Sequence, residues 1–499
     1  MRKNKLIMAL FLICLFTNAF ASTGEIGSYL QSISDNHVKL HDFFKSMPKG
    51  GELHYHYTGS AYPEYLIKLA KEGNYCIDPN TMRISRFSSE CRGMLTKKFL
   101  LAPKNQKKAI NAWSMRNVIT NYKIRYDHFF NVFAKVNPIY EDYYQNILAD
   151  MINRAAEQHE LYMEIMLPML TNAEKYAKLI KHTNDLDEKM RILLASVEFQ
   201  NSVKRMIDQT NTYLNGANQK LNCNKNPHSP ACEITVKFHA FVFRDIPIDE
   251  VFAQALAAFL AQAHSENIVG VNLVRSEKDL IAKHDFSKHM KIFNFLHSQY
   301  PNSHISLHAG ELDAKTNKLS DLCCHITQSV YQGHAKRIGH GTDINYEKNN
   351  INLLKHMAKN HIAVEINLTS NKLILSIEGD QHPILYYLNH NVPIVLSTDD
   401  EGILETDLTS QFVDAVKLYK LSYKTIKNIN RNALSYSFLP GKSIWLNHET
   451  GVFIPDCKIL SSKKCLKFIT NNQKAYLQWK LENELNNFEK KVPAYLVTT

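Results

Sequence analysis

Eight short runs of apolar, β-type residues recur along this chain, and each is followed by a segment long enough to form a helix. The segments between them place apolar residues at helical spacing, as in DEVFAQALAAFLAQAHSEN at 249–267. Eight parallel strands with crossover helices close into a (β/α)8 TIM barrel, and the alternative is an open doubly wound sheet. The expected strands are GELHYHY (51–57), LYMEIML (161–167), ITVKFHAFVF (234–243), IVGVNLV (268–274), HISLHAG (304–310), RIGHG (337–341), AVEINL (363–368) and VPIVLST (392–398).

Polar side chains close several of these runs, at the point where each strand would end. In a barrel of parallel strands the carboxyl ends meet at one face, where the βα loops carry the chemistry. Randomly placed histidines would not favour strand ends, so we expect these residues to form one site. They are His54 and His56, then His308, then His340, then Asp399 and Asp400.

The stretch GELHYHYTGS places two histidines one residue apart. Side chains alternate faces along a strand, so His54 and His56 point the same way and could bind one metal ion. The alternative is a half-buried strand that happens to carry both, because the chain holds 23 histidines and short motifs arise by chance. The other strand ends decide between these interpretations.

In SLHAGE, Glu311 follows His308 by three residues, across a small Ala-Gly turn. Glu311 could therefore stand beside a metal bound by His308 without binding it, which suits a general acid or base. The alternative is that His308 ends a strand and Glu311 opens a helix, where the helix dipole favours an acid.

RIGHGT sets His340 between two glycines, where the backbone can approach a ligand closely. Its alternative is a turn histidine bonded to the backbone. VLSTDDEG ends a strand in Asp399 and Asp400, of which one could bind metal and the other substrate. The alternative for this pair is a helix N-cap.

Taken together, three imidazoles and one carboxylate suit a zinc-class divalent ion and leave one position for water. The metal lowers the pKa of that water, and a nearby base completes the nucleophile. Glu311 and His340 are the candidates to manage protons and charge. The predicted chemistry is hydrolytic attack on an electrophilic carbon.

The motifs MPKGGELHYHYTGS, SLHAGE, RIGHGT and STDDEG, in this order, resemble the adenosine/AMP deaminase family of the amidohydrolase superfamily. MPKGG and the N-terminal leader are similar to its secreted branch, the adenosine deaminase growth factor-like proteins. VEINLTSN from Val364 and NINRNALSYSF from Asn428 also resemble family stretches, so the likeness runs from Phe43 to Phe438.

This resemblance implies one Zn²⁺ ion per chain and a role for each site residue. The implied zinc ligands are His54, His56, His308 and Asp399. Glu311 would protonate purine N1 and relay protons, His340 would orient and stabilise the activated water, and Asp400 would hold purine N7. Water would add to C6 and ammonia would leave.

Two positions depart from the family pattern at the expected substrate-binding residues. Members that act on adenosine carry an acid two residues after the second metal histidine; this chain has Thr58 there and keeps Gly59. The family glycine whose backbone approaches purine N3 matches Arg275 in GVNLVRSE. An arginine there would crowd the purine or pair with an anion such as phosphate, unless it faces solvent or pairs with Glu277.

The N-terminus has the pattern of a secretory signal peptide. Basic MRKNK precedes the apolar run LIMALFLICLF, which is too short to span a bilayer, and an A-x-A end predicts cleavage after Ala21. An uncleaved anchor is the alternative. We expect a secreted or periplasmic protein with no membrane segment after cleavage.

Nine cysteines are present, and Cys14 is lost with the leader. The polar setting of three local pairs predicts surface loops stapled by disulfides, as in exported proteins. Adjacent Cys323 and Cys324 rarely bridge without strain, so their state stays open. The three pairs are Cys76 with Cys91, Cys223 with Cys232, and Cys457 with Cys465.

The expected organisation has one barrel with additions at both ends and two insertions. It comprises a signal peptide at 1–21, an N-terminal helical segment at 22–46, the barrel at 47–440 with disulfide-clamped insertions at 74–115 and 210–233, and a helical C-terminal extension at 441–499.

The formal charge of +11 falls to +8 without the leader, which carries Arg2, Lys3 and Lys5 and no acid. Because the lysines are dispersed among acids, we expect no specific nucleic-acid binding. Secreted relatives dimerise through N-terminal helices, so a homodimer is one arrangement, although only residues 22–50 precede the first strand in the mature chain.

The preferred hypothesis is an exported, zinc-dependent deaminase of adenosine or 2'-deoxyadenosine. A second hypothesis is deamination of a modified or phosphorylated adenine compound. A third is a secreted binding or signalling protein that keeps the barrel without catalysis; it leaves the set Glu311, His340 and Asp400 unexplained.

Overall fold

The computed structural model describes residues 24–88, 91, 93–118, 121–168, 170 and 172–496. The signal peptide expected at 1–21 lies outside the described residues. Within these ranges no helix combines the length and the apolar character needed to cross a membrane.

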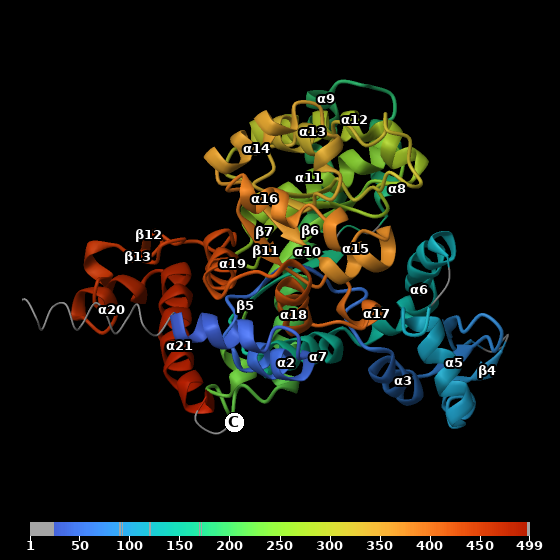
Figure 1. Ribbon diagram of the computed structural model, residues 1–499. Coiled ribbons are helices and arrows are strands. Elements are labelled where there is room, and N and C mark those ends of the chain that lie inside the picture. Colours follow the sequence, from blue (N-terminus) through green and yellow to red (C-terminus); the bar gives the residue numbers. More distant parts are fainter. Residues whose placement is uncertain are drawn as a thin grey trace, which may run out of the picture.

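In the described part of the chain, eight parallel strands lie at the centre of the molecule with helices around them (Figure 1). They are β1 (Glu52–His56), β5 (Tyr162–Pro168), β6 (Thr235–Phe243), β7 (Ile268–Val274), β8 (Ser306–Ala309), β9 (Arg337–His340), β10 (Ala363–Ile366) and β11 (Ile394–Leu396). Two sheets, β1-β5-β6-β7 and β8-β9-β10-β11, meet where Val271 bridges Ile305 and Tyr55 bridges Asp399. The sheet is therefore closed, and the expected (β/α)8 barrel is confirmed over the open sheet.

The barrel strands are buried on both faces, which explains their continuous apolar sequences. All seven residues of β7 are buried, and helix α11 (Ile248–His264) packs against β6 and β7 through an almost entirely apolar surface. Asp279 caps the following helix α12 (Leu280–Gln299) by accepting from the backbone of Ile281. The remaining barrel helices are α8 (Ala173–Ile180), α9 (Leu186–Ala195), α10 (Val197–Lys220), α13 (His325–Tyr331), α14 (Asn350–Lys359), α15 (Leu368–Leu375), α16 (Ile384–Asn389), α17 (Glu401–Leu404), α18 (Leu408–Tyr419) and α19 (Tyr423–Ser435).

The connection between β1 and β5 is a small folded unit that projects at the lower right of Figure 1. The disulfide expected between Cys76 and Cys91 is present, and buried Trp113 donates to the carbonyl of Met82 at 2.8 Å. The insertion expected at 74–115 is thus packed structure as well as loop. The helices and strands of the connection between β1 and β5 are α3 (Pro63–Glu72), β2 (Tyr75–Ile77), β3 (Ile84–Arg86), β4 (Met94–Leu95), α4 (Thr96–Phe99), α5 (Pro103–Trp113), α6 (Tyr122–Asp142) and α7 (Tyr144–Glu157).

The second expected insertion, 210–233, was predicted as a disulfide-clamped loop, but its first half is helical. Helix α10 continues unbroken to Lys220, because its buried face extends through Thr210, Gly216 and Ala217. Only the following turn, closed by the Cys223–Cys232 disulfide, is a loop. The polar surface of this helix hid its helical spacing.

The two terminal segments meet beside the barrel, where α2 and α21 lie close together in Figure 1. Helix α2 (His37–Ser46) buries Phe43, whose ring lies 5.2 Å from that of Phe488 on α21 (Gln473–Leu496). The Cys457–Cys465 disulfide joins the chain before α20 (Lys463–Thr470) to that helix, and Cys323 and Cys324 are also paired. The extension also holds the short hairpin β12 (Trp445–Asn447) and β13 (Val452–Phe453).

A buried arginine links three strands inside the barrel. Arg337 on β9 donates from Nε to Glu365 on β10 and from Nη2 to Glu164 on β5, each at 2.5 Å. Its Nη1 donates to the carbonyl of Tyr436 at 2.8 Å. Burial raises the pKa of Glu365, but Arg337 outweighs it and holds that pKa at about 2. Both carboxylates therefore remain ionised in the core.

Replacing Arg337 with methionine should destabilise the fold strongly, because Glu164 and Glu365 would stay buried without a counter-charge. Removing one partner of a buried pair costs about 3–5 kcal/mol, which should lower the midpoint of urea unfolding clearly. Arg191→Met, at a side chain that is 76% exposed, is the matched control and should change the midpoint little. Equal midpoints for both variants would contradict this role of Arg337.

Candidate metal centre and substrate cavity

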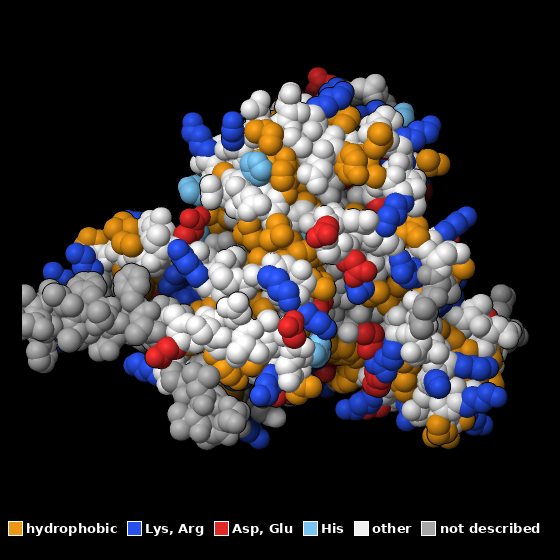
Figure 2. Space-filling view, in the orientation of Figure 1, with side chains coloured by type: hydrophobic (Ala, Val, Ile, Leu, Met, Phe, Trp, Pro, Cys, Tyr) orange, Lys and Arg blue, Asp and Glu red, His pale blue; other side chains and the backbone are white. Residues whose placement is uncertain are grey.

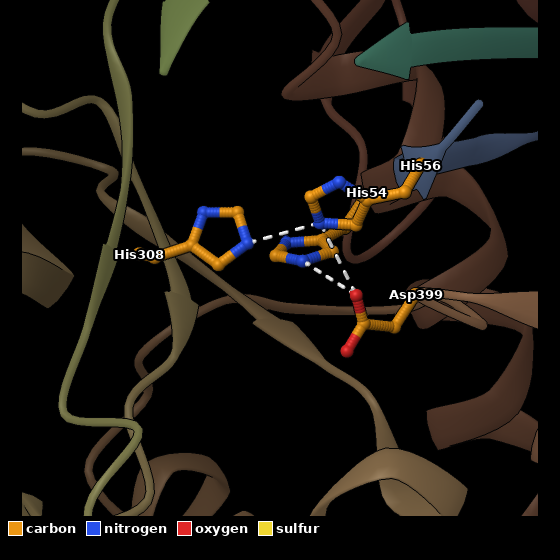
Figure 3. A group of neighbouring side chains, drawn as sticks. All are labelled: His54, His56, His308 and Asp399. Carbon is orange, nitrogen blue, oxygen red and sulfur yellow. Dashed lines mark hydrogen bonds and ion pairs between the residues drawn. The ribbon is translucent and has the colours of Figure 1, made fainter. Parts of the chain in front are cut away.

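Three histidines and an aspartate converge at one end of the barrel (Figure 3). The metal-binding atoms of His54, His56, His308 and Asp399 all lie within 4.8 Å of one another. The Nε2 atoms of His56 and His308 are 3.2 Å apart, and Asp399 Oδ1 lies 3.3 Å from His56 Nε2. Four expected ligands from three distant parts of the sequence thus share one centre.

The backbone that closes the barrel also positions these ligands. The carbonyl of His54 accepts from the N–H of Asp399 at 3.1 Å, and the carbonyl of Asp399 accepts from the N–H of His56 at 3.0 Å. Because side chains alternate along β1, both imidazoles then face the same centre as the Asp399 carboxylate. Asp399 adopts φ +69, which turns the chain sharply after β11.

Three of the four ligands are oriented by a buried partner on the side away from the centre. Glu365 contacts His54 Nδ1 at 2.7 Å, Asn272 Oδ1 contacts His308 Nδ1 at 2.9 Å, and Ser370 donates to Asp399 Oδ2 at 2.6 Å. These contacts leave the Nε2 atoms directed at the centre, as metal-binding histidines require.

The donor set fits a zinc ion. His54 Nε2 is buried and makes no hydrogen bond within the described residues, so a cation would satisfy it. Burial lowers the pKa of His56 to about 4 and holds that of His308 well below its usual value, which favours the neutral imidazoles that bind metals. Three nitrogens and one oxygen leave room for a water molecule.

Glu311 lies beside this centre without joining the four ligands. Its carboxylate is 3.7 Å from His340 Nε2, and its backbone N–H donates to Glu277 at 2.8 Å. Burial and the nearby Asp399 charge raise the pKa of Glu311 to about 8, although Arg244 opposes the shift. Near neutral pH this carboxyl group therefore holds a proton that it can donate.

His340 reaches the same centre from the end of β9. Its Nε2 is buried without a hydrogen-bond partner among the described residues and lies 3.9 Å from Asp399 Oδ2. A Cβ at the preceding Gly339 would come within 2.7 Å of the His54 ring. This glycine is therefore required for close approach of the two histidines.

Asp400 lies against Gly59, which follows β1. It is 4% exposed, and its Oδ1 has no hydrogen-bond partner in the described ranges. A Cβ at Gly59 would overlap this carboxylate, so only glycine fits there. Burial and the charge of Asp399 raise the pKa of Asp400 well above its usual value, which favours a protonated carboxyl that can donate.

A cavity of about 500 Å³ opens from the metal centre. Thr58 and Arg275 line it along with Glu311, His340 and Asp400. Aromatic side chains form much of the cavity wall. The sequence analysis did not identify them as site residues, because Phe or Tyr at helical spacing usually indicates a buried core. They are Phe129, Phe130, Phe133 and Tyr140 on α6, with Tyr57, Tyr144, Tyr213, Phe241 and Phe243.

Arg275 is exposed at the cavity mouth, with its guanidinium 4.4 Å from the centroid of the Phe243 ring. Its φ of +84 lies in the region that glycine prefers, as the family position suggested. Glu277 does not pair with Arg275: it contacts His325 Nδ1 at 2.5 Å and lies 3.6 Å from buried Arg244. The Arg275 guanidinium is therefore not neutralised by Glu277.

Comparison with known proteins gives a consistent picture. The family model described as Adenosine deaminase matches residues 202–444. An adenosine deaminase from Pectobacterium atrosepticum is 27% identical over 191 residues, which cover 38% of this chain and 51% of the relative. The chain thus spans about half the length of the curated relatives it matches.

Two solved structures share the fold at low sequence identity. Arabidopsis ADAL complexed with IMP is 17% identical with a TM-score of 0.53, covering 90% of this chain and 99% of that chain. An amidohydrolase from Burkhoderia ambifaria with bound Zn is 14% identical with a TM-score of 0.51, covering 91% and 94%. Residues 202–444 are therefore similar to the adenosine deaminase family, and the barrel is the fold of both solved structures.

Proposed function

We propose that this protein is a zinc-dependent hydrolase that converts the C6 amine of an adenine compound to a carbonyl and releases ammonia. The observation that carries the proposal is the convergence of the four ligands with Glu311 and His340 at the base of one cavity. A protein that only binds a partner has no need of this arrangement.

The four ligands would hold one Zn²⁺, which lowers the pKa of a bound water toward neutrality and so supplies the nucleophile. The nitrogen-rich donor set supports zinc over magnesium or calcium. A relative of the same fold was solved with bound Zn.

The residues around the metal then divide the remaining tasks. Glu311, whose pKa is raised to about 8, would donate its proton to purine N1 and relay protons to the leaving ammonia. Protonated Asp400 would donate a hydrogen bond to the acceptor N7. His340 would hold the attacking oxygen. The aromatic wall of the cavity would exclude bulk water.

We take adenosine or 2'-deoxyadenosine as the substrate, in line with the activity that the Pectobacterium relative is named for. A phosphorylated or modified adenine compound is the second candidate, because Arg275 lines the cavity and ADAL was solved with IMP. Thr58 lies where an acid would contact ribose, which removes a negative charge that would repel phosphate.

Export from the cytoplasm is part of the proposal and has a structural correlate. The disulfides Cys76–Cys91, Cys223–Cys232 and Cys457–Cys465 persist in oxidising compartments and are rare in the cytosol. Figure 2 shows Lys and Arg side chains scattered over one face with acidic residues among them. This face offers no single basic block for nucleic acid.

Incubation with adenosine, 2'-deoxyadenosine, AMP and N6-methyladenosine should release ammonia from the first two most efficiently. A chelator should abolish the release and added zinc should restore it. Arg275→Ala should leave kcat/KM for adenosine near wild type and lower it for AMP, because only AMP carries a phosphate. No chelator-sensitive release from any of the four compounds would overturn the proposed function.

Glu311→Gln should lower kcat by about 10²- to 10⁴-fold, the contribution typical of a general acid or base. Bound zinc, measured by elemental analysis, should stay near wild type because Glu311 is not one of the four ligands. Glu378→Gln, at a half-exposed surface ion pair, provides the matched control. Near-normal turnover by Glu311→Gln would show that another group handles the proton.

His308→Ala should lose zinc, since one of three imidazole ligands is removed. Elemental analysis after dialysis should detect substoichiometric metal, while His284→Ala, whose side chain is 78% exposed, retains it. Full zinc occupancy in His308→Ala would mean that the ligand set is wrong.

A further inference from the structure

A chain of hydrogen bonds runs from the loop before α16 to His340. The N–H of Ile384 donates to His382 Nδ1 at 3.1 Å, and His382 Nε2 lies 3.0 Å from Asn371 Oδ1. Asn371 Nδ2 lies 3.0 Å from His340 Nδ1. Among the described residues, His382 hydrogen-bonds to none of the four metal ligands, so this chain reaches the centre only through Asn371 and His340.

The backbone N–H at one end fixes the direction of every bond in the chain. His382 Nδ1 must accept from Ile384, so in a neutral imidazole its Nε2 carries the hydrogen. That hydrogen is donated to Asn371 Oδ1, which turns the amide nitrogen toward His340. The amide nitrogen can only donate, so His340 Nδ1 must be the acceptor.

The side chains of this hydrogen-bond chain are buried. Asn371 and His340 are fully buried, and His382 is 4% exposed. Burial lowers the pKa of His382 to about 3. A second amide, Asn367 Nδ2, lies 3.4 Å from the same His340 Nδ1 and donates in the same sense.

The consequence falls on the other nitrogen of His340. With Nδ1 occupied as an acceptor, the single proton of the neutral ring resides on Nε2. This is the buried atom that has no hydrogen-bond partner within the described residues and that faces Glu311 and Asp399. His340 therefore presents a donor to the reaction centre and has no lone pair there to take a proton.

We propose that His382 is a positioning residue that acts through Asn371 to hold His340 as the Nε2–H tautomer, so that His340 donates a hydrogen bond to the attacking oxygen and leaves proton transfer to Glu311. The tautomer follows from the hydrogen bonds alone; its effect on turnover rests on the proposed function. A fixed donor directed at an oxygen that gains negative charge stabilises the transition state without reorganisation.

The tautomer can be tested by ¹⁵N NMR of histidine-labelled, zinc-loaded protein, with the His340 signals assigned by their loss in His340→Gln. We expect a protonated Nε2 and an unprotonated Nδ1 in the wild type. Asn371→Asp should reverse this, because a carboxylate accepts from Nδ1–H. Unprotonated Nε2 in the wild type, or an unchanged tautomer in Asn371→Asp, would overturn the proposal.

Kinetics then test the consequence for turnover. Asn371→Asp should lower kcat by about 10²- to 10³-fold, the effect of losing one preorganised donor, with KM and zinc content unchanged. His382→Phe should lower kcat by about tenfold, since Asn371 can then rotate. His382→Gln keeps an amide donor in place of Nε2–H and should restore most of this loss.

His390→Phe is the matched control, because the His390 ring contacts the carbonyl of Tyr386 away from the centre. Its kcat should match wild type. Equal losses in His382→Gln and His382→Phe would mean that His382 acts only by packing and would overturn the proposal. If the wild type turns over no adenine compound, the proposed function fails, and the NMR result still decides the tautomer.

Discussion

The ion pair between Arg337 and Glu365 supports both the barrel and its metal centre. Glu365 is fully buried, and a carboxylate there would take up a proton without a counter-charge. One of its oxygens accepts from Arg337 Nε at 2.5 Å, and the other faces His54 Nδ1 at 2.7 Å. Because the arginine keeps the carboxylate ionised, His54 Nδ1 keeps its hydrogen and Nε2 is left free for a metal. The buried charge of Arg337 therefore determines, through Glu365, which nitrogen of His54 carries the hydrogen.

The metal centre and the closing seam of the barrel are made by the same residues. Asp399 exchanges backbone hydrogen bonds with His54 and His56 where β11 meets β1. The ligands can therefore meet only if the first and last strands pair, and a bound ion would hold that pairing in place. This coupling explains why ligands far apart in the sequence come together without any connecting motif. Closure of the sheet brings these ligands together.

Sequence patterns predicted the eight strands and the polar residues that end them, because strand burial and strand ends leave local signals. They did not predict that 210–220 continues helix α10, since a polar helix surface resembles a loop. They also did not distinguish Phe129 and the other aromatic residues of the cavity wall from ordinary core packing. Arg244 and His382 carry no local signal at all. Their roles depend on partners brought close only by the closed barrel, such as Glu277 and Asn371.

The carboxyl groups of Asp399, Glu311 and Asp400 lie in one centre but have different surroundings. Burial raises the pKa of all of them, but the histidines around Asp399 outweigh it and hold that group ionised. Burial and the nearby Asp399 charge act on Glu311, and its pKa rises to about 8. One carboxylate is thus suited to bind a cation while its neighbour retains a proton. Since the hydrogen bonds to His340 Nδ1 leave that ring without a free acceptor, Glu311 is the group beside the metal that can both give and take a proton.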